Sequence, residues 1–144
     1  MNVELALLAD YAAVTKEGKL VAAGIFDVLL SPTLPWKQPT MYIALRVRFH
    51  PGEEGAHKIR LRLVDPDGTE IVSLGADVTV GAGDPLEGSS IQAVLSLNNI
   101  SLKVEGRHAF DIFLDGRYEH TVPLRVKRAP SSAKTPPKSG TSGS

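Results

Sequence analysis

The sequence "MYIALRVRF" at residues 41–49 places an apolar side chain at every second position. Arginine, tyrosine and alanine fill the positions between. Because successive side chains of a β-strand point to opposite faces, this pattern predicts a strand with one buried face. The segment "KIRLRLV" at residues 58–64 repeats the rule, with Lys58, Arg60 and Arg62 on its outer side.

Six further segments have strand character, at residues 2–14, 20–30, 70–80, 91–97, 106–114 and 118–126. Turns rich in glycine, proline and aspartate separate them at intervals of about ten residues, and helical spacing is absent. We therefore predict an all-β fold, namely an antiparallel eight-stranded β-sandwich of Greek-key, immunoglobulin-like type. A closed barrel is the structural alternative. The long loops at residues 31–39 and 81–89 are predicted to cross between sheets.

Two hairpins carry register information. In the first, "TKEG" ends with Gly18 as the last residue of a three-residue loop, which sets Asp10 opposite Gly24. Asp10 and Asp27 then face opposite sides and cannot form a catalytic pair, so each is expected to accept backbone hydrogen bonds. In the last hairpin, Asp115-Gly116 is typical of a two-residue turn, whereas alternation favours Ile112 opposite His120. Both registers stay open.

Residues 1–128 are predicted to form one domain, and residues 129–144 a disordered tail without large apolar side chains. The chain has 16 basic and 16 acidic residues and no cysteine. The domain is slightly acidic, which argues against a nucleic-acid partner. The absence of a signal-like or membrane-spanning stretch predicts no membrane partner and a cytoplasmic location.

Candidate metal and catalytic motifs are weak. His50 and His57 flank a loop that contains Glu53 and Glu54, a sparse set of ligands for a divalent metal. "DPDG" at residues 65–68 has the aspartate spacing of calcium loops, but turn chemistry explains it fully. No nucleophile elbow or phosphate loop occurs. The prediction is that the chain needs no cofactor and is not an enzyme.

One charged pattern stands out. If Phe49 lies opposite Ile59, Arg48 lies opposite Arg60 and Arg46 opposite Arg62. Like charges directly opposite each other are unfavourable and need compensation. Either the side chains extend into water beside acids on neighbouring strands, or they bind an acidic partner. The predicted partner-binding residues are Arg46, Arg48, Lys58, Arg60 and Arg62.

Several short motifs carry a resemblance to a known family. They are "ADYA" at residues 9–12, "GKL" at 18–20, "GIFD" at 24–27, and the G-x-H-x-F, LDG and VPLRV segments between 106 and 126. The chain resembles a family of short bacterial proteins that is classed as a domain of unknown function. The resemblance implies an immunoglobulin-like sandwich without assigned catalytic residues. His108 stands where such domains often have a corner tyrosine.

The function predicted from these observations is a non-enzymatic protein-interaction module that docks through a basic sheet face or a sheet edge. Its partner would be another protein with an acidic surface, or a second copy of the chain. The alternative is a structural subunit of a homo-oligomer or filament, since uncovered sheet edges can pair. A metal-dependent or small-ligand enzyme is the least favoured class.

Overall fold

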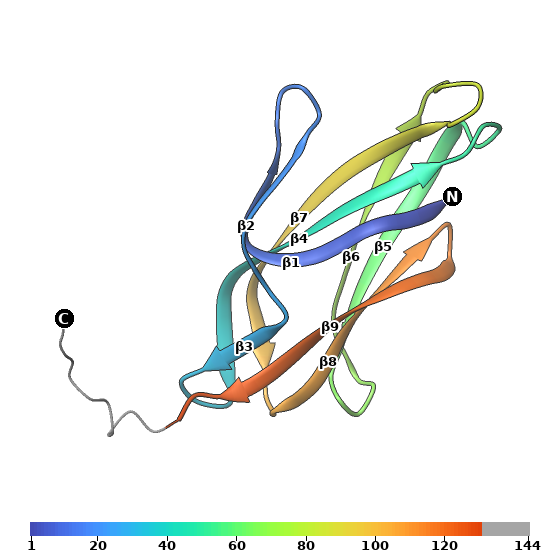
Figure 1. The fold of residues 1–144 in the computed structure, drawn as a ribbon. Coiled ribbons are helices and arrows are strands. Elements are labelled where there is room, and N and C mark those ends of the chain that lie inside the picture. The colour runs from blue at the N-terminus through green and yellow to red at the C-terminus, as the bar shows by residue number, and fades with distance from the viewer. Residues whose placement is uncertain (131–144) are drawn as a thin grey trace, which may run out of the picture.

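Residues 1–130 are described by a computed structural model, and they form nine strands without a helix (Figure 1). The strands are β1 (Asn2–Val14), β2 (Leu20–Phe26), β3 (Val28–Ser31), β4 (Trp36–Phe49), β5 (Gly55–Val64), β6 (Glu70–Val80), β7 (Ser89–Leu102), β8 (Gly106–Leu114) and β9 (Arg117–Arg128). Nothing in this part of the chain is a helix long and apolar enough to cross a membrane.

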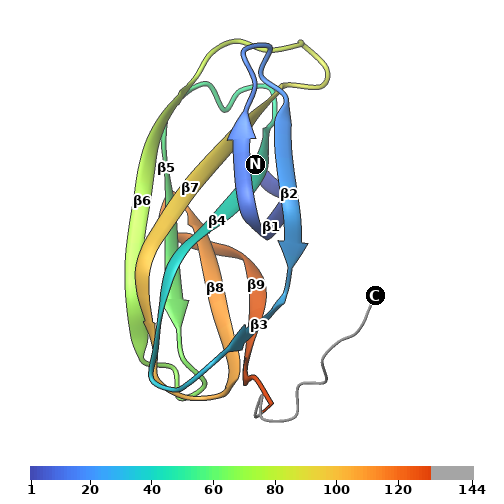
Figure 2. The same cartoon turned by 90° about the vertical axis from the view of Figure 1, so that its left-hand side faces the viewer.

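The strands form two sheets, one in the order β2-β1-β4-β7 and the other in the order β3-β9-β8-β5-β6. The sheets lie one over the other and enclose a single apolar core (Figure 2). The predicted all-β class is confirmed. The predicted count of eight strands and the purely antiparallel arrangement are wrong, because there are nine strands and β3 runs parallel to β9. The Greek-key, immunoglobulin-like description stays a prediction.

The extra strand arises because the predicted strand at residues 20–30 is divided in two. The chain bends at Asp27, so that β2 pairs with β1 in one sheet and β3 pairs with β9 in the other. The carbonyl oxygen of Asp27 accepts a hydrogen bond of 2.8 Å from the N–H of Arg125. Apolar residues lie on both sides of Asp27, and therefore periodicity could not reveal the bend.

The two long loops do connect the sheets, but the first is shorter than predicted. β4 already begins at Trp36 and includes Pro39. β1 pairs with β4 only as far as Tyr42, so the segment around Pro39 has a neighbour on one side only. A proline is tolerated there because its missing N–H interrupts no ladder on the open side.

Strands β4 and β5 face each other across the core instead of pairing. Their inward rows are almost completely buried, with Met41, Ile43, Leu45, Val47 and Phe49 from β4 and Ile59, Leu61 and Leu63 from β5. The predicted pairing of Phe49 with Ile59 is wrong, because β4 pairs with β1 and β7, and β5 with β6 and β8. The inward faces of both strands were predicted correctly.

The hairpin registers are resolved. β1 and β2 pair with Ala9 opposite Ile25 and Tyr11 opposite Ala23, in the predicted register. In the last hairpin Ile112 lies opposite His120, while Phe113 lies opposite Tyr118. A two-residue turn is thus followed by a bulge, which restores the alternation. The Asp115-Gly116 turn and the alternation of the flanking strands therefore each predicted part of this hairpin.

Most of the predicted tail at residues 129–144 lies outside the described residues, which end at residue 130. The N–H of Ala129 still donates a 2.7 Å hydrogen bond to the carbonyl oxygen of Ser31. The β3–β9 pairing therefore extends one residue beyond the end of β9.

A core substitution tests the strand phase. Leu61 is 1% exposed and lies opposite Leu74 and Ile112. Leu61→Ala should lower the free energy of unfolding by roughly 2–5 kcal/mol in urea titrations, because it leaves a cavity. Lys58→Ala, on the outer face of the same strand, serves as control and should change it by less than about 0.5 kcal/mol. Equal effects would show that the phase is wrong.

Candidate functional site

The five predicted partner-binding residues lie on two opposite surfaces of the molecule. Arg46 and Arg48 project from the outer face of β4, and Lys58, Arg60 and Arg62 from the outer face of β5. The prediction that these five residues form a single patch is therefore wrong. β4 and β5 belong to different sheets, and their charged faces point away from each other. A role of these side chains in partner binding stays a prediction.

Glu4 neutralises the two arginines of β4. Its two carboxylate oxygens accept hydrogen bonds from the Nε atoms of Arg46 and Arg48, each 3.1 Å long. The β1–β4 register shifts between Val3 and Leu5, so that Glu4 is the extra residue of a bulge. The hydrogen bond from Arg48 is the main cause that lowers the pKa of Glu4 below its usual value.

Arg62 is held within its own sheet. Its Nη2 atom lies 3.4 Å from the Oδ2 atom of Asp111, which is opposite on β8. The guanidinium also lies over the ring of Phe113, 5.3 Å from the ring centre. The hydroxyl of Thr121 donates a 2.8 Å hydrogen bond to Asp111 and fixes the carboxylate.

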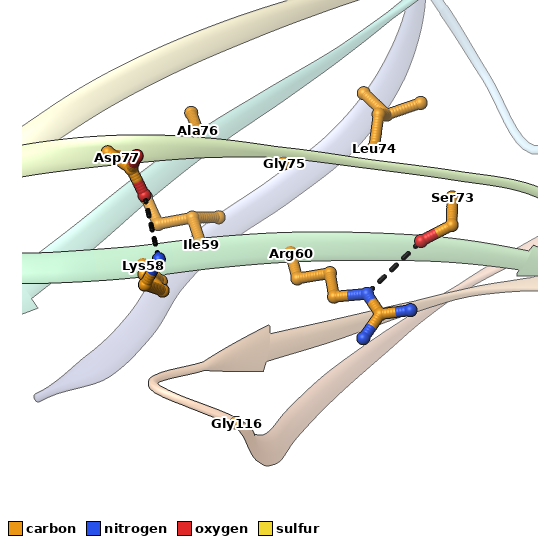
Figure 3. Close-up of a pocket in the computed structure, with 9 residues that line it drawn as sticks. All are labelled: Lys58, Ile59, Arg60, Ser73, Leu74, Gly75, Ala76, Asp77 and Gly116. Carbon is orange, nitrogen blue, oxygen red and sulfur yellow. Dashed lines mark hydrogen bonds and ion pairs between the residues drawn. The ribbon is translucent and has the colours of Figure 1, made fainter.

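Arg60 differs from the other four cations, because no carboxylate within residues 1–130 forms an ion pair with it. Its Nε atom donates a 3.1 Å hydrogen bond to the hydroxyl of Ser73, so the side chain reaches from β5 to the edge strand β6 (Figure 3). Its cross-strand neighbours are Gly75 and Phe113, which carry no charge. Arg60 is the strongest candidate for an external anionic partner.

A groove of about 500 Å³ surrounds this arginine on the outer surface of β5 and β6. It is lined by Lys58, Ile59, Arg60, Ser73, Leu74, Gly75, Ala76, Asp77 and Gly116. A Cβ atom at Gly75 would lie only 2.8 Å from the carbonyl oxygen of Ile59, so glycine alone fits there without displacement. Lys58 and Asp77 approach to 3.7 Å beside Gly75, but both side chains are about four-fifths exposed (Figure 3). This ion pair is therefore weak.

The β8–β9 turn, which contributes Gly116 to the groove, is fixed to β5 by Asp115. The Oδ1 atom of Asp115 accepts a 2.8 Å hydrogen bond from the N–H of Lys58, and its Oδ2 atom lies 2.6 Å from His57 Nδ1. The N–H of Lys58 is the main cause that lowers the pKa of Asp115. The second ring nitrogen of His57 contacts the carbonyl oxygen of Glu53. Since both ring nitrogens face acceptors, the protonated imidazole is favoured, and the Asp115 hydrogen bond raises the pKa of His57.

The weaker candidate motifs have structural roles. His57 contacts Asp115, whereas His50 contacts Asn2. The Oδ1 atom of Asp65 accepts hydrogen bonds of 2.9 Å from the N–H groups of Asp67 and Thr69, as the turn chemistry predicted. Within the described residues, no group of three or more His, Asp or Glu side chains is placed to hold a metal ion.

The remaining residues singled out from the sequence do not assemble into a site. The Asp10 carboxylate lies against Gly24, where a Cβ atom would be only 2.5 Å from Oδ2. Asp27 lies at the bend between the sheets, and its backbone carbonyl, not its side chain, is the observed acceptor. His108 is fully buried, and its Nδ1 atom lies 3.2 Å from the carbonyl oxygen of Gly106.

Sequence reasoning missed Ser73, Gly75 and Asp77, which complete the groove. The available signal was Gly75, an isolated glycine in an otherwise alternating strand, which often marks a bulge or a close approach of another backbone. Arg60 was among the predicted residues, but it was expected opposite Arg48, so its position beside Gly75 was not predicted.

Charge reversal distinguishes the two arginine surfaces. Arg46→Glu places a carboxylate beside Glu4 and should lower the thermal midpoint of a dilute sample. Arg60→Glu is the matched variant on the other surface and should leave it nearly unchanged, because no carboxylate pairs with Arg60 within residues 1–130. A larger decrease of the thermal midpoint for Arg60→Glu than for Arg46→Glu would contradict the assignment of ion pairs.

The His57–Asp115 contact predicts a pH-dependent stability. The pKa of His57 is raised above 6.5 in the folded state. The contribution of this contact to the free energy of unfolding is therefore complete at a pH below the unfolded-state pKa of His57. It is lost as the pH rises through the folded-state pKa of His57. The stability difference between the natural chain and His57→Gln should shrink as the pH rises, as measured by urea unfolding.

Asp115→Asn is the control for this contact, since asparagine tolerates the positive φ of 50° at this position and still accepts from Lys58. In the Asp115→Asn background, substitution of His57 should show a much weaker pH dependence. If the difference in the free energy of unfolding between the natural chain and His57→Gln stayed constant or widened as the pH rises, the assigned role of the contact would be contradicted.

Comparison with solved structures shows a distant similarity. The chain is similar to Pseudomonas fluorescens alkylpurine DNA glycosylase AlkC bound to DNA containing an abasic site analog, with 11% sequence identity and a TM-score of 0.46. The alignment covers 86% of this chain and 30% of that chain, so this chain spans under a third of its length. No curated protein matches the chain.

Two exclusions made from the sequence must be corrected. We predicted that the chain is not an enzyme and has no nucleic-acid partner. The similar structure is that of a DNA glycosylase with DNA bound, so neither exclusion is retained. At this identity and TM-score the similarity supports no argument for an activity or a ligand of this chain.

A family comparison covers nearly all of the described chain. The family model matches residues 4–127, from the third residue of β1 to the penultimate residue of β9. The motifs that suggested a family of unknown function lie within this range. The chain therefore belongs to the family of unknown function DUF6941.

Proposed function

We propose that this chain is a protein-interaction module that docks an extended segment of a partner along β6, with a carboxylate of that segment held by Arg60. One observation carries the proposal, namely an arginine that reaches the edge of a sheet and forms no ion pair with a carboxylate in residues 1–130. The sheet edge and the basic face, which the sequence suggested separately, meet at this point.

The edge strand supports docking by strand addition. β6 has eleven residues and ends its sheet, and Figure 2 shows it along one margin of the molecule. An edge strand leaves half of its N–H and C=O groups unpaired, and proteins usually protect such edges with lysine or proline. β6 contains neither residue, and its charged side chains are those of Glu70 and Asp77. An added strand would satisfy these groups, as in other peptide-recognition domains.

The inward face of β6 offers apolar contacts to an added strand. Val72, Leu74 and Val78 are only half-buried, although they pack against the core. The next strand of the sheet would cover them. Side chains of an extended segment alternate between the two faces, so one set would cover these residues and the other would reach Arg60.

β7 is the edge of the other sheet, and its neighbour β4 carries Lys37 opposite Ser101 but, within residues 1–130, no arginine without a carboxylate partner. The neighbouring strand β4 carries Arg46 and Arg48, and Glu4 occupies the Nε atoms of both. Arg48 also donates to the carbonyl oxygen of Glu87. The β6 edge is therefore the better candidate.

Two labelled peptides test the proposal by fluorescence anisotropy. Each alternates valine with threonine, and one central threonine is replaced by aspartate in the first and by asparagine in the second. At low salt the aspartate peptide should bind about two- to fivefold more tightly, the range expected for one exposed ion pair. Arg60→Ala should abolish this preference, while Arg107→Ala on the same sheet should preserve it.

Equal binding of both peptides, or an unchanged preference in Arg60→Ala, would contradict the proposal. A short single-stranded DNA is the competing probe. If it bound in an Arg60-dependent manner while neither peptide did, a protein partner at this edge would be wrong.

A further inference from the structure

We infer that the partner strand at the β6 edge is β6 of a second copy of this chain, paired antiparallel about a two-fold axis at Gly75. The inference rests on the proposed docking function of this edge and names its partner. It joins the two five-stranded sheets of the copies into one continuous sheet. Such an interface is isologous and closes on itself, as most natural dimers do.

The sequence of β6 is complementary to itself in this register. Residues 72–78 read "VSLGADV". With Gly75 opposite its own copy, Val72 lies opposite Val78, Leu74 opposite Ala76, and Ser73 opposite Asp77. Large and small apolar residues thus meet on the inward face, while polar residues meet on the outward face. Direct cross-strand neighbours of this kind stabilise antiparallel sheets.

The charges of the groove are also complementary. Arg60 donates its Nε hydrogen to Ser73, and Asp77 of the second copy would lie directly opposite that serine. Its carboxylate therefore comes within reach of the terminal nitrogens of Arg60. The intramolecular contact of Asp77 with Lys58 is 3.7 Å long and exposed, so it does not prevent this pairing. The two-fold axis produces the Arg60–Asp77 contact twice.

Repulsion does not oppose the association. The chain has 16 basic and 16 acidic residues, so its copies carry no net charge at pH 7. The two Arg60 side chains flank the axis in the row of Gly75, but each is directed toward its own Ser73 and thus away from the axis. Half-buried Leu74 and Val78 would become covered in both copies at once.

Charge reversal with rescue tests the contact by sedimentation equilibrium. The natural chain should form dimers, and Arg60→Glu and Asp77→Lys should each raise the dissociation constant by about tenfold or more, because each creates two like-charge pairs per dimer. The double variant Arg60→Glu/Asp77→Lys restores opposite charges and should recover most of the affinity. Arg107→Glu is the matched control and should dimerise normally.

Disulfide trapping tests the register, since the chain has no cysteine of its own. Ser73→Cys and Asp77→Cys are prepared separately and oxidised alone or mixed. The mixture should give a covalent dimer of one chain of each kind, because directly opposite residues satisfy disulfide geometry. Each variant alone should give little, because its two cysteines lie well apart along the paired strands.

The outcomes separate this inference from the proposed function. A monomer that still binds the aspartate peptide through Arg60 would overturn the second copy as partner and leave the docking function intact. A dimer that is insensitive to both charge reversals, or is not trapped through residues 73 and 77, would also overturn the inference. Failure of both peptide binding and dimerisation would overturn both.

Discussion

The burial of the inward rows of β4 and β5 against each other is the constraint on which the rest of the structure depends. Each row is almost free of solvent contact, because the facing sheet covers it. Hydrophobic burial is the main favourable term in folding. The chain crosses between the two sheets after β2, β3, β4, β6 and β7, and the resulting strand order leaves β6 and β7 as edges, together with β3 and β2.

The same constraint distributes the charges. Since the two sheets turn their polar faces outward in opposite directions, five cations that are close in sequence divide into two groups. In each group a neighbouring strand supplies carboxylates, with Glu4 on β1 and Asp111 on β8 as the closest examples. Arg60 is the exception, because its two cross-strand neighbours are a glycine and a phenylalanine. Within residues 1–130, no carboxylate forms an ion pair with Arg60.

Asp115 links a local turn to the candidate site. As a turn residue it has a positive φ of 50°, which aspartate tolerates better than most residues. Its carboxylate is also an acceptor for the backbone of β5 and for His57. One residue thus shapes the last hairpin and positions a wall of the groove beside Arg60. The two residues that its carboxylate contacts, Lys58 and His57, are 57 and 58 positions away in the sequence.

Alternation and turn chemistry are local properties, and from them the all-β class, the inward faces of the strands, the register of the first hairpin and the turn at Asp65 were predicted correctly. The sequence by itself could not determine which strands pair. The bend at Asp27, the separation of β4 from β5 and the Arg60 groove with Ser73, Gly75 and Asp77 depend on contacts between distant residues. Several strand pairings are compatible with the same alternation of apolar residues in the sequence. Only the packing of the two sheets against each other selects one of these pairings.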